Sequence, residues 1–194
     1  SVRRRLGLPE AYLLYLGGFD LRKNVPQLLE AYALAGDRLH GLPLVIAGRL
    51  PNRDTPFAPD PRPIITRLGL KGRVHLPGWV AEADKPALYS GAVAFCFPST
   101  YEGFGLPVLE AISCGTPAIV ASGSSLEEVA GPGALVVPPG DVRALAEALI
   151  RVTTDNELRD TLCSAGLEHS RRFSWQRTAA QTLAAAQPAR MSDG

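Results

Sequence analysis

Short apolar runs alternate with longer amphipathic stretches along most of the sequence, and this alternation restricts the possible fold more than any other feature. Most of the apolar runs end at glycine or proline, which is typical of strands buried on both faces of a sheet. They cover residues 12–16, 43–47, 73–76, 93–97, 118–121 and 134–137. Between them, apolar residues recur at helical spacing in residues 24–35, 85–92, 106–114, 125–130 and 141–152.

Strands that alternate with helices predict right-handed β-α-β crossovers. The predicted fold class is therefore α/β: a doubly wound, Rossmann-like parallel sheet of about six strands with helices on both faces. Beyond residue 152 only helical patterns remain, at residues 155–165 and 174–186. We expect residues 1–194 to form a single domain. Residues 172–188 would be a closing C-terminal helix, with Trp175 and Leu183 facing a partner surface.

Two segments depart from this alternation. Residues 50–63 contain five prolines, which predicts an extended loop, either a lid over a site or a solvated excursion. The chain opens on Ser1-Val2-Arg3-Arg4-Arg5, without an initiator methionine or a signal peptide, as an interrupted linker would. This opening leads us to expect that a further N-terminal domain is absent from the sequence.

Composition and charge exclude several classes of function. The formal net charge is +1, so we expect neither nucleic acid nor an anionic membrane as the main partner. Cys96, Cys114 and Cys163 lack metal-ligand spacing and are predicted to be buried, reduced thiols. No run approaches the length of a membrane span. The predicted location is the cytoplasm, either free or peripheral to a membrane, with any membrane contact made through the parent protein.

The strongest local signal is the segment from Pro98 to Glu110, which follows a predicted strand and opens a predicted helix. Ligands of open α/β sheets bind beyond the carboxyl ends of the strands, so this segment is well placed for a site. Its glycines, Gly103 and Gly105, let the backbone approach a ligand closely. Pro107 suits the first position of the helix. The amides of Phe104, Gly105 and Leu106 would then point outward and could hold a diphosphate.

Two carboxylates flank this loop. Glu110 is expected in the first turn of the helix, close enough to hydrogen-bond sugar hydroxyls, and Glu102 could reach over the same ligand. A glutamate near a helix N-terminus is also favoured by the helix dipole alone. The pairing with the Gly-Phe-Gly-Leu-Pro sequence is what favours a functional role.

A second signal follows the first predicted strand. Gly17 and Gly18 are followed by two cations, Arg22 and Lys23, immediately before a predicted helix. Arg22 could contact phosphate through two donors and Lys23 as a point charge. The alternative is a solvated basic turn with Asn24 as the helix N-cap.

The segment from Glu102 to Glu110 resembles the Glu-x7-Glu motif of family 4 retaining glycosyltransferases of the GT-B fold, and the likeness covers nearly the whole chain. The further segments that carry it are residues 15–18 with 22–24, 74–80, 114–117, 128–131 and 173–175. The resemblance implies that this chain is the C-terminal, donor-binding half of such an enzyme. The acceptor site would then lie on the missing N-terminal domain.

The resemblance also implies a role for each candidate residue. Lys23 and Arg22 would bind the donor diphosphate, Glu110 the ribose hydroxyls, and Glu102 the donor sugar or its leaving phosphate. The remaining donor-binding residues would act largely through the backbone, with Val80 at the base and the others around the sugar and diphosphate: Gly17, Gly18, Gly103, Phe104, Gly105, Leu106 and Pro107. Such enzymes generally need neither a metal nor a cofactor beyond the nucleotide-diphosphate sugar.

One residue departs from the family pattern: many relatives carry arginine where this chain has Gly18. The Gly-Gly…Arg-Lys-Asn pattern resembles mannosyltransferase-like members and favours GDP-mannose as the donor. We expect the isolated chain to bind donor without transferring sugar to the glycan or lipid-linked acceptor. The alternatives are a non-catalytic nucleotide-sugar-binding subunit that needs a separate acceptor-binding partner, and a dinucleotide-dependent oxidoreductase. The latter is disfavoured because no complete Gly-x-Gly-x-x-Gly with a later acid is present.

Overall fold

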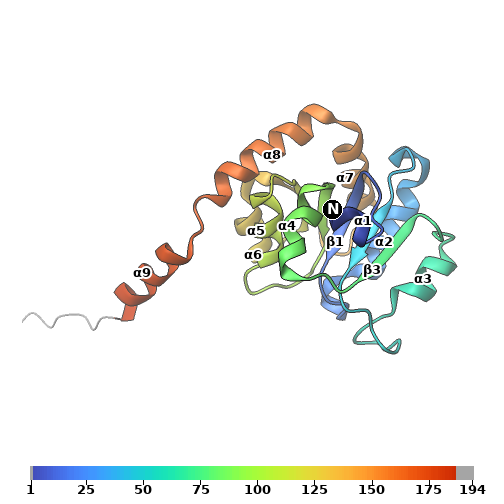
Figure 1. The fold of residues 1–194 in the computed structure, drawn as a ribbon, viewed down its shortest axis with the longest axis horizontal. Helices are drawn as coiled ribbons and strands as arrows, with labels where there is room; N and C mark the ends of the chain where they lie inside the picture. Colours follow the sequence, from blue (N-terminus) through green and yellow to red (C-terminus); the bar gives the residue numbers. More distant parts are fainter. Residues whose placement is uncertain (1, 187–194) are drawn as a thin grey trace, which may run out of the picture.

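The computed structural model describes residues 2–186, which form a parallel α/β fold (Figure 1). Six strands make one sheet in the order β3-β2-β1-β4-β5-β6, and every neighbouring pair is parallel. The strands are β1 Tyr12–Leu16, β2 Leu44–Ala47, β3 Val74–Gly78, β4 Ala92–Phe97, β5 Ala118–Ala121 and β6 Ala134–Val137. The predicted fold class and the predicted number of strands are confirmed.

Helices cover both faces of the sheet. They are α1 Val2–Arg5, α2 Val25–Ala35, α3 Pro61–Arg67, α4 Lys85–Ser90, α5 Leu106–Ser113, α6 Ser125–Ala130, α7 Val142–Thr154, α8 Asn156–Ser170 and α9 Trp175–Ala186. On one face α2 packs against α3 and α7, and on the other α5 packs against α4, α6 and α8. This arrangement follows from right-handed crossovers, because the chain winds outward from β1 in one direction and returns across it to continue from β4.

The strands are buried because both of their faces meet helices. Every residue of β1, β2 and β5 is buried, and aromatic rings on β1, β4 and α4 fill the centre. Phe97 stacks on Tyr15 at 5.9 Å between ring centroids and on Phe95 at 5.5 Å. The buried tyrosines keep their hydroxyl groups hydrogen-bonded, as when Tyr12 donates to the carbonyl of Leu88 at 2.7 Å.

The largest correction to the predicted elements concerns the proline-rich segment. Helix α3 begins at Pro61, inside the stretch predicted as loop up to residue 63. Asp60 caps this helix by accepting a hydrogen bond from the amide of Arg62 at 2.9 Å. Pro61 and Pro63 lie in the first turn, where the missing amides have no intrahelical partner to lose. Here proline starts a helix instead of excluding one.

Smaller corrections concern caps and cysteines. Ser124 caps α6, and Glu127 accepts a hydrogen bond from the amide of Gly123 at 2.6 Å. Cys96 is buried as predicted, but Cys114 and Cys163 are only half-buried. All three cysteines are free thiols, and burial raises the pKa of each.

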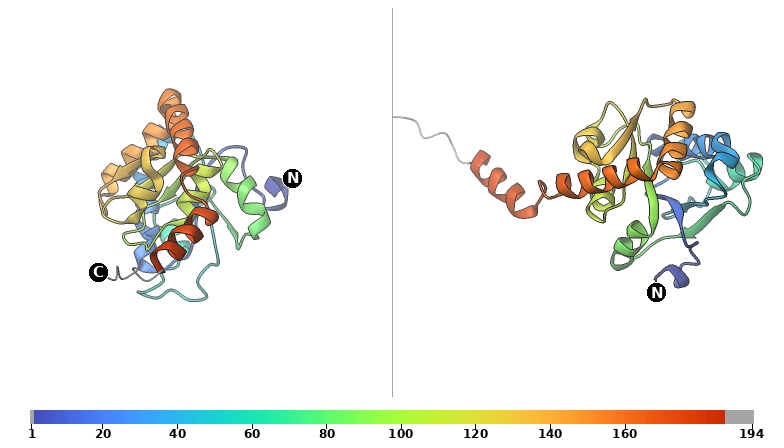
Figure 2. Two further views of the ribbon diagram at one scale, coloured as in Figure 1. Left: turned by 90° about the vertical axis from the view of Figure 1, so that its left-hand side faces the viewer. Right: turned by 90° about the horizontal axis from the view of Figure 1, so that it is seen from above.

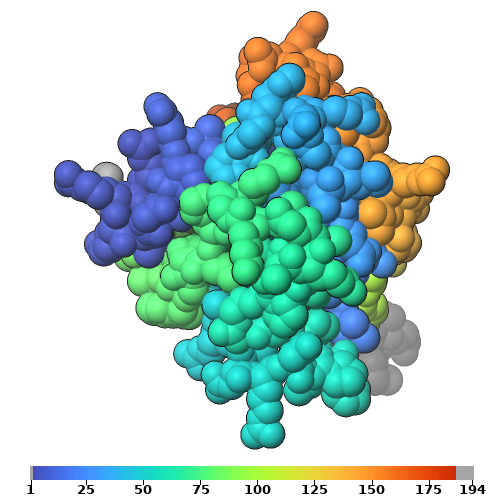
Figure 3. All heavy atoms as spheres, turned by 90° about the vertical axis from the view of Figure 1, so that its right-hand side faces the viewer, coloured from blue at the N-terminus to red at the C-terminus, as the bar shows by residue number. Residues whose placement is uncertain are grey.

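Space-filling and ribbon views place the ends of the described chain. The N-terminal residues lie beside α4 (Figure 3), where Arg5 forms an ion pair with Asp84. At the other end α9 extends away from the sheet (Figure 2), contains no buried residue, and leaves Trp175 78% and Leu183 68% exposed. Closure of this helix onto a second domain stays a prediction, and residues 187–188 lie outside the described part. None of the described helices has the length and apolarity that crossing a bilayer requires.

Helix α8 reaches the body of the fold through a close contact between two glycines. A Cβ atom built on Gly133 would lie 2.5 Å from the Cα atom of Gly166, in the middle of α8. A Cβ atom on Gly166 would in turn lie 3.2 Å from Gly133 and from Ile112 of α5. The absence of both side chains lets α8 pack directly on backbone.

Gly133→Ala should therefore destabilise the fold by about 1–3 kcal/mol, because the added methyl group meets backbone that cannot rotate away. Gly103→Ala is the matched control, since a Cβ atom at this exposed position meets nothing within 4 Å. Urea unfolding of both variants measures the difference. Equal loss of stability in the two variants would contradict the proposed glycine contact.

Candidate functional site

The candidate residues meet at the point where the strand order reverses. β1 and β4 are neighbours at the centre of the sheet, and the loops that follow them are joined by hydrogen bonds. The amide of Thr100 donates to the carbonyl of Arg22 at 2.8 Å, and the Ser99 hydroxyl oxygen lies 3.1 Å from the same carbonyl. Ligands of doubly wound sheets bind at this crevice.

Glu102 holds the two predicted cations together. Its Oε1 atom accepts hydrogen bonds from Lys23 Nζ at 2.5 Å and from the Ser99 hydroxyl at 2.7 Å, and it lies 3.1 Å from Arg22 Nη1. The side chains of Lys23 and Glu102 are each only 12% exposed. The ammonium of Lys23 also lies over the ring of Phe97, 4.9 Å from its centroid. We call Asp20, Arg22, Lys23, Ser99 and Glu102 the switch-point cluster.

The environment of Glu102 keeps it ionised. Burial alone would raise its pKa, but hydrogen bonds from Lys23 and Ser99 and the charges of Lys23 and Arg22 outweigh burial, so the pKa of Glu102 is lowered. All of its donors within the described chain reach Oε1. The Oε2 atom is therefore left free to accept a hydrogen bond from a ligand.

The charges of the switch-point cluster cancel within the chain. Arg22 pairs with Asp20 at 2.9 Å and Lys23 pairs with Glu102, which gives two cations and two anions. An approaching diphosphate would have to share these cations with their carboxylate partners. The long-range attraction of this cluster for an anion is consequently weaker than that of two unpaired cations.

Glu102→Gln should lower the free energy of unfolding at pH 7 by about 1–3 kcal/mol, because the nearly buried ammonium of Lys23 loses its counterion. The folded-state pKa of Glu102 is depressed, so its contribution is complete above the unfolded-state pKa of about 4.3 and is lost as the pH falls through the folded-state value. The difference in the free energy of unfolding between wild type and variant should therefore disappear in acid. Urea unfolding from pH 7 to pH 3 measures it.

Glu168→Gln is the control for this experiment, because Glu168 forms an exposed ion pair with Arg171 and its loss should cost less than about 0.5 kcal/mol. A gap between wild type and Glu102→Gln that stays constant from pH 7 to pH 3 would show that Glu102 does not stabilise the fold as a carboxylate.

Residues 103–106, the glycine loop, present backbone donors beside this cluster. Gly105 is the N-cap of α5 with φ of 103°, in the left-handed region that favours glycine. Pro107 occupies the second helical position, one residue later than predicted. Within residues 2–186 the amides of the glycine loop donate to no acceptor. They can therefore bind an anion at the N-terminus of α5.

Ser125 fixes the backbone of this loop, a role that the sequence patterns did not single out. Its hydroxyl lies 2.8 Å from the carbonyl of Glu102 and 3.0 Å from the carbonyl of Phe104. Ser125 is the first residue of α6 and follows β5. Its place after the neighbouring strand was the only signal that could have marked it.

Glu110 lies in the second turn of α5, not in the first as predicted, because the helix begins at Leu106. Its Oε2 atom accepts a hydrogen bond from the hydroxyl of Tyr89 on α4 at 2.8 Å. Burial, followed by the charge of Glu110 and by this hydrogen bond, raises the pKa of Tyr89. Tyr89 lies on a predicted helix with no polar motif, so sequence patterns gave no reason to place it beside Glu110.

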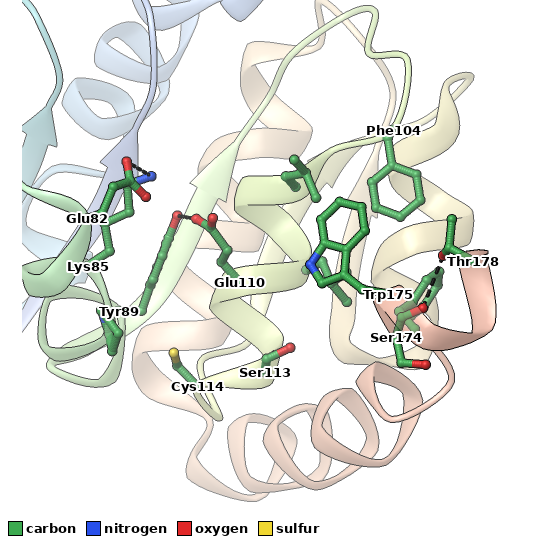
Figure 4. A pocket seen from close by; sticks show the side chains of 14 residues that line it. Glu82, Lys85, Tyr89, Phe104, Glu110, Ser113, Cys114, Ser174, Trp175 and Thr178 are labelled. Atoms are coloured by element: carbon green, nitrogen blue, oxygen red, sulfur yellow. Dashed lines mark hydrogen bonds and ion pairs between the residues drawn. The ribbon is translucent and has the colours of Figure 1, made fainter. Parts of the chain in front are cut away.

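A pocket of about 510 Å³ opens beside Glu110 (Figure 4). Tyr89 and Glu110 face one another at one side, and Phe104 and Trp175 lie across from them. The polar and charged residues that line it are Glu82, Lys85, Tyr89, Glu110, Ser113, Ser174 and Thr178. The apolar side is formed by Phe104, Leu106, Leu109, Phe173 and Trp175.

The structure divides the predicted site residues between two places. Lys23, Arg22 and Glu102 belong to the switch-point cluster, while Glu110, Phe104 and Leu106 line the pocket. The glycine loop joins these two places.

The predicted residues Val80, Gly17 and Gly18 belong neither to the switch-point cluster nor to the pocket lining. Val80 is buried, 3% exposed, so only its backbone could meet a base. Gly17 is packed under Tyr15 and Phe97, and the carbonyl of Gly18 accepts a hydrogen bond from the hydroxyl of Tyr15. No cluster of three potential metal ligands occurs within residues 2–186, and metal independence stays a prediction.

Comparison with known sequences decides the family. The sequence model of the family described as "Glycosyl transferases group 1" matches residues 2–169. The chain belongs to this family. The O-antigen chain mannosyltransferase B of Escherichia coli is 36% identical to it over 175 residues, which cover 90% of this chain and 45% of that protein.

Solved structures of glycosyltransferases share the fold of this group 1 chain. A sucrose-phosphate synthase from Thermosynechococcus elongatus superposes with a TM-score of 0.83 at 32% identity, over 95% of this chain and 47% of that one. HepE from Anabaena, solved with UDP-glucose, superposes with a TM-score of 0.81 at 24% identity, over 95% and 51% of the two chains, and shows likeness of fold only. This chain spans about half the length of these proteins or less.

Proposed function

We propose that this chain is the nucleotide-sugar donor-binding domain of a retaining hexosyltransferase. The observation that carries the proposal is the glycine loop, whose unbonded amides lie between the cations of the switch-point cluster and the pocket at Glu110. The two anionic groups of a nucleoside diphosphate match the amides and the cations, and its polar nucleoside matches the pocket. Membership of the group 1 family supports the assignment to sugar transfer.

Each part of the donor has a partner in this arrangement. The glycine-loop amides, Lys23 and Arg22 bind the diphosphate and stabilise the charge that develops on it as it leaves. Glu110 accepts hydrogen bonds from the ribose hydroxyls, and the backbone around Val80 meets the base. In this scheme the loop amides, with the two cations that the diphosphate shares with their carboxylate partners, stabilise the leaving group without a metal ion.

The ionised state of Glu102 suggests which part of the donor it meets. A carboxylate repels a nearby phosphate but accepts hydrogen bonds readily from hydroxyl groups. Its free Oε2 atom therefore binds the donor sugar, while Oε1 holds Lys23 toward the phosphates. The mannosyltransferases among the relatives favour GDP-mannose as the donor.

Transfer itself requires an acceptor site that this chain does not supply. The relatives are at least about twice as long, and the acceptor, a glycan or a lipid-linked glycan, would bind to the additional N-terminal domain. The isolated chain is then inactive in transfer, and any membrane contact is made by the parent protein. The alternative, a non-catalytic donor-binding subunit with a separate partner chain, is supported by the exposed residues of α9. Co-purification of such a partner would favour it.

Isothermal titration calorimetry with GDP, UDP and ADP tests the proposed function. We expect GDP to bind most tightly, and Lys23→Ala and Glu110→Ala each to weaken binding about 10-fold, which corresponds to about one lost charge-assisted hydrogen bond. Lys71→Ala and Glu147→Ala remove an exposed lysine and an exposed glutamate elsewhere and should leave the affinity unchanged. Absence of binding by all three nucleotides, or equal loss in the control variants, would reject the proposal.

Tyr89→Phe tests the ribose contact separately. Removing the hydroxyl releases Glu110 from its only side-chain donor in the described chain, so GDP should bind about 3- to 10-fold more weakly. The affinity for 2′,3′-dideoxy-GDP should not change, because that nucleotide lacks the hydroxyl groups that would donate hydrogen bonds to Glu110. The same loss with both nucleotides, measured by calorimetry, would mean that Tyr89 acts only on the fold.

A further inference from the structure

We propose that Phe173 and His169 are positioning residues for the glycine loop, so that the segment between α8 and α9 sets the geometry of donor binding. Only the effect on nucleotide binding rests on the proposed function; the effect on the loop geometry does not. The segment, residues 171–174, is called the α8–α9 joint. The family resemblance includes residues 173–175 but gives them no role in donor binding.

The side chain of Phe104 contacts the joint. Phe104 is 42% exposed and lies outside the buried core. Its aromatic partner among the described residues is Phe173, whose ring meets it edge-on at 5.9 Å between centroids and 83° between planes. Because Phe104 lies within the glycine loop, a contact that fixes its side chain also restrains the neighbouring backbone amides.

The joint is in turn anchored to α6. The ring of His169 meets that of Phe173 at 5.4 Å and 64°. Its Nε2 atom lies 3.0 Å from the carbonyl of Glu128. The same ring packs on Gly131, where a Cβ atom would lie 2.6 Å from it. His169 is therefore held by the C-terminal end of α6.

Helix α6 connects both ends of this arrangement. Ser125 at its start binds the carbonyls that flank Gly103 and Phe104, and Glu128 and Gly131 at its end hold His169. The backbone of the glycine loop is thus fixed from one side by Ser125. The side chain of Phe104 is fixed from the other side by Phe173.

The joint also forms part of the pocket wall. Phe173, Ser174, Trp175 and Thr178 line the same pocket as Tyr89 and Glu110 (Figure 4), while α9 beyond Thr178 extends away from the body. The direction in which α9 leaves the joint is consequently coupled to Phe104 and to the loop amides. A ligand on the loop and a contact on α9 would each bias the same aromatic pair.

The ligand-free chain of 194 residues provides the first test. Phe173→Ala should change the ¹⁵N–¹H NMR shifts of Gly103, Phe104, Gly105 and Leu106, and His169→Ala should change the same signals because it frees Phe173. Leu183→Ala, an exposed position further along α9, should leave them unchanged. Loop signals that do not respond to Phe173→Ala would overturn the inference, whether or not the chain binds a nucleotide.

Calorimetry with GDP, UDP and ADP provides the second test. Phe173→Ala should lower the affinity for the nucleotide that wild type binds by about 2- to 12-fold, the range expected for loss of an aromatic pair. Phe173→Tyr keeps the ring and should restore the affinity. Shifted loop signals with unchanged affinity would overturn the positioning role. If wild type binds none of the three nucleotides, the proposed function fails, and the NMR comparison alone decides whether the joint positions the loop.

Discussion

The contact between Lys23 and Glu102 is the interaction on which the candidate site depends. It joins the loop after β1 to the loop after β4, two segments that lie far apart in sequence and meet only because their strands are neighbours. A nearly buried ammonium needs a counterion, and a nearly buried carboxylate needs donors, so each group fixes the other. The same contact leaves the switch-point cluster without net charge. In the proposed function, anion binding would therefore depend strongly on the backbone amides of the glycine loop.

Backbone geometry carries much of the chemistry in this chain. The glycine loop offers four amides without acceptors among residues 2–186, and Gly105 adopts a conformation that a side chain would disfavour. Ser125 and the α8–α9 joint hold this loop from two sides, which limits the reorganisation needed when a ligand arrives. Family membership, the topology and this loop are consistent with one another. In the proposed function, donor identity would depend on contacts that the backbone makes with the base and the sugar.

Much of the fold could be predicted because burial on two faces leaves a plain pattern. Strands β1, β5 and β6 have the predicted bounds, since an apolar run that ends at glycine, serine or proline has few other solutions. The prediction was wrong at residues 61–63, where proline density was taken as loop although Asp60 and Pro61 form a helix start. It also placed Glu110 in the first turn of α5, whereas the helix begins with Leu106 ahead of Pro107 and Glu110 is its fifth residue, in the second turn.

By itself, the sequence determined the parallel α/β architecture and the family resemblance, because local periodicity and short motifs depend on neighbouring residues. It also predicted the loops after β1 and β4 as the place where a ligand would bind. Only the tertiary structure decided that Glu102 neutralises Lys23, that Tyr89 donates to Glu110, and that Phe173 contacts Phe104. These pairs are separated by 79, 21 and 69 positions along the chain. Side-chain contacts over such separations follow from strand order and helix packing, which no local pattern encodes.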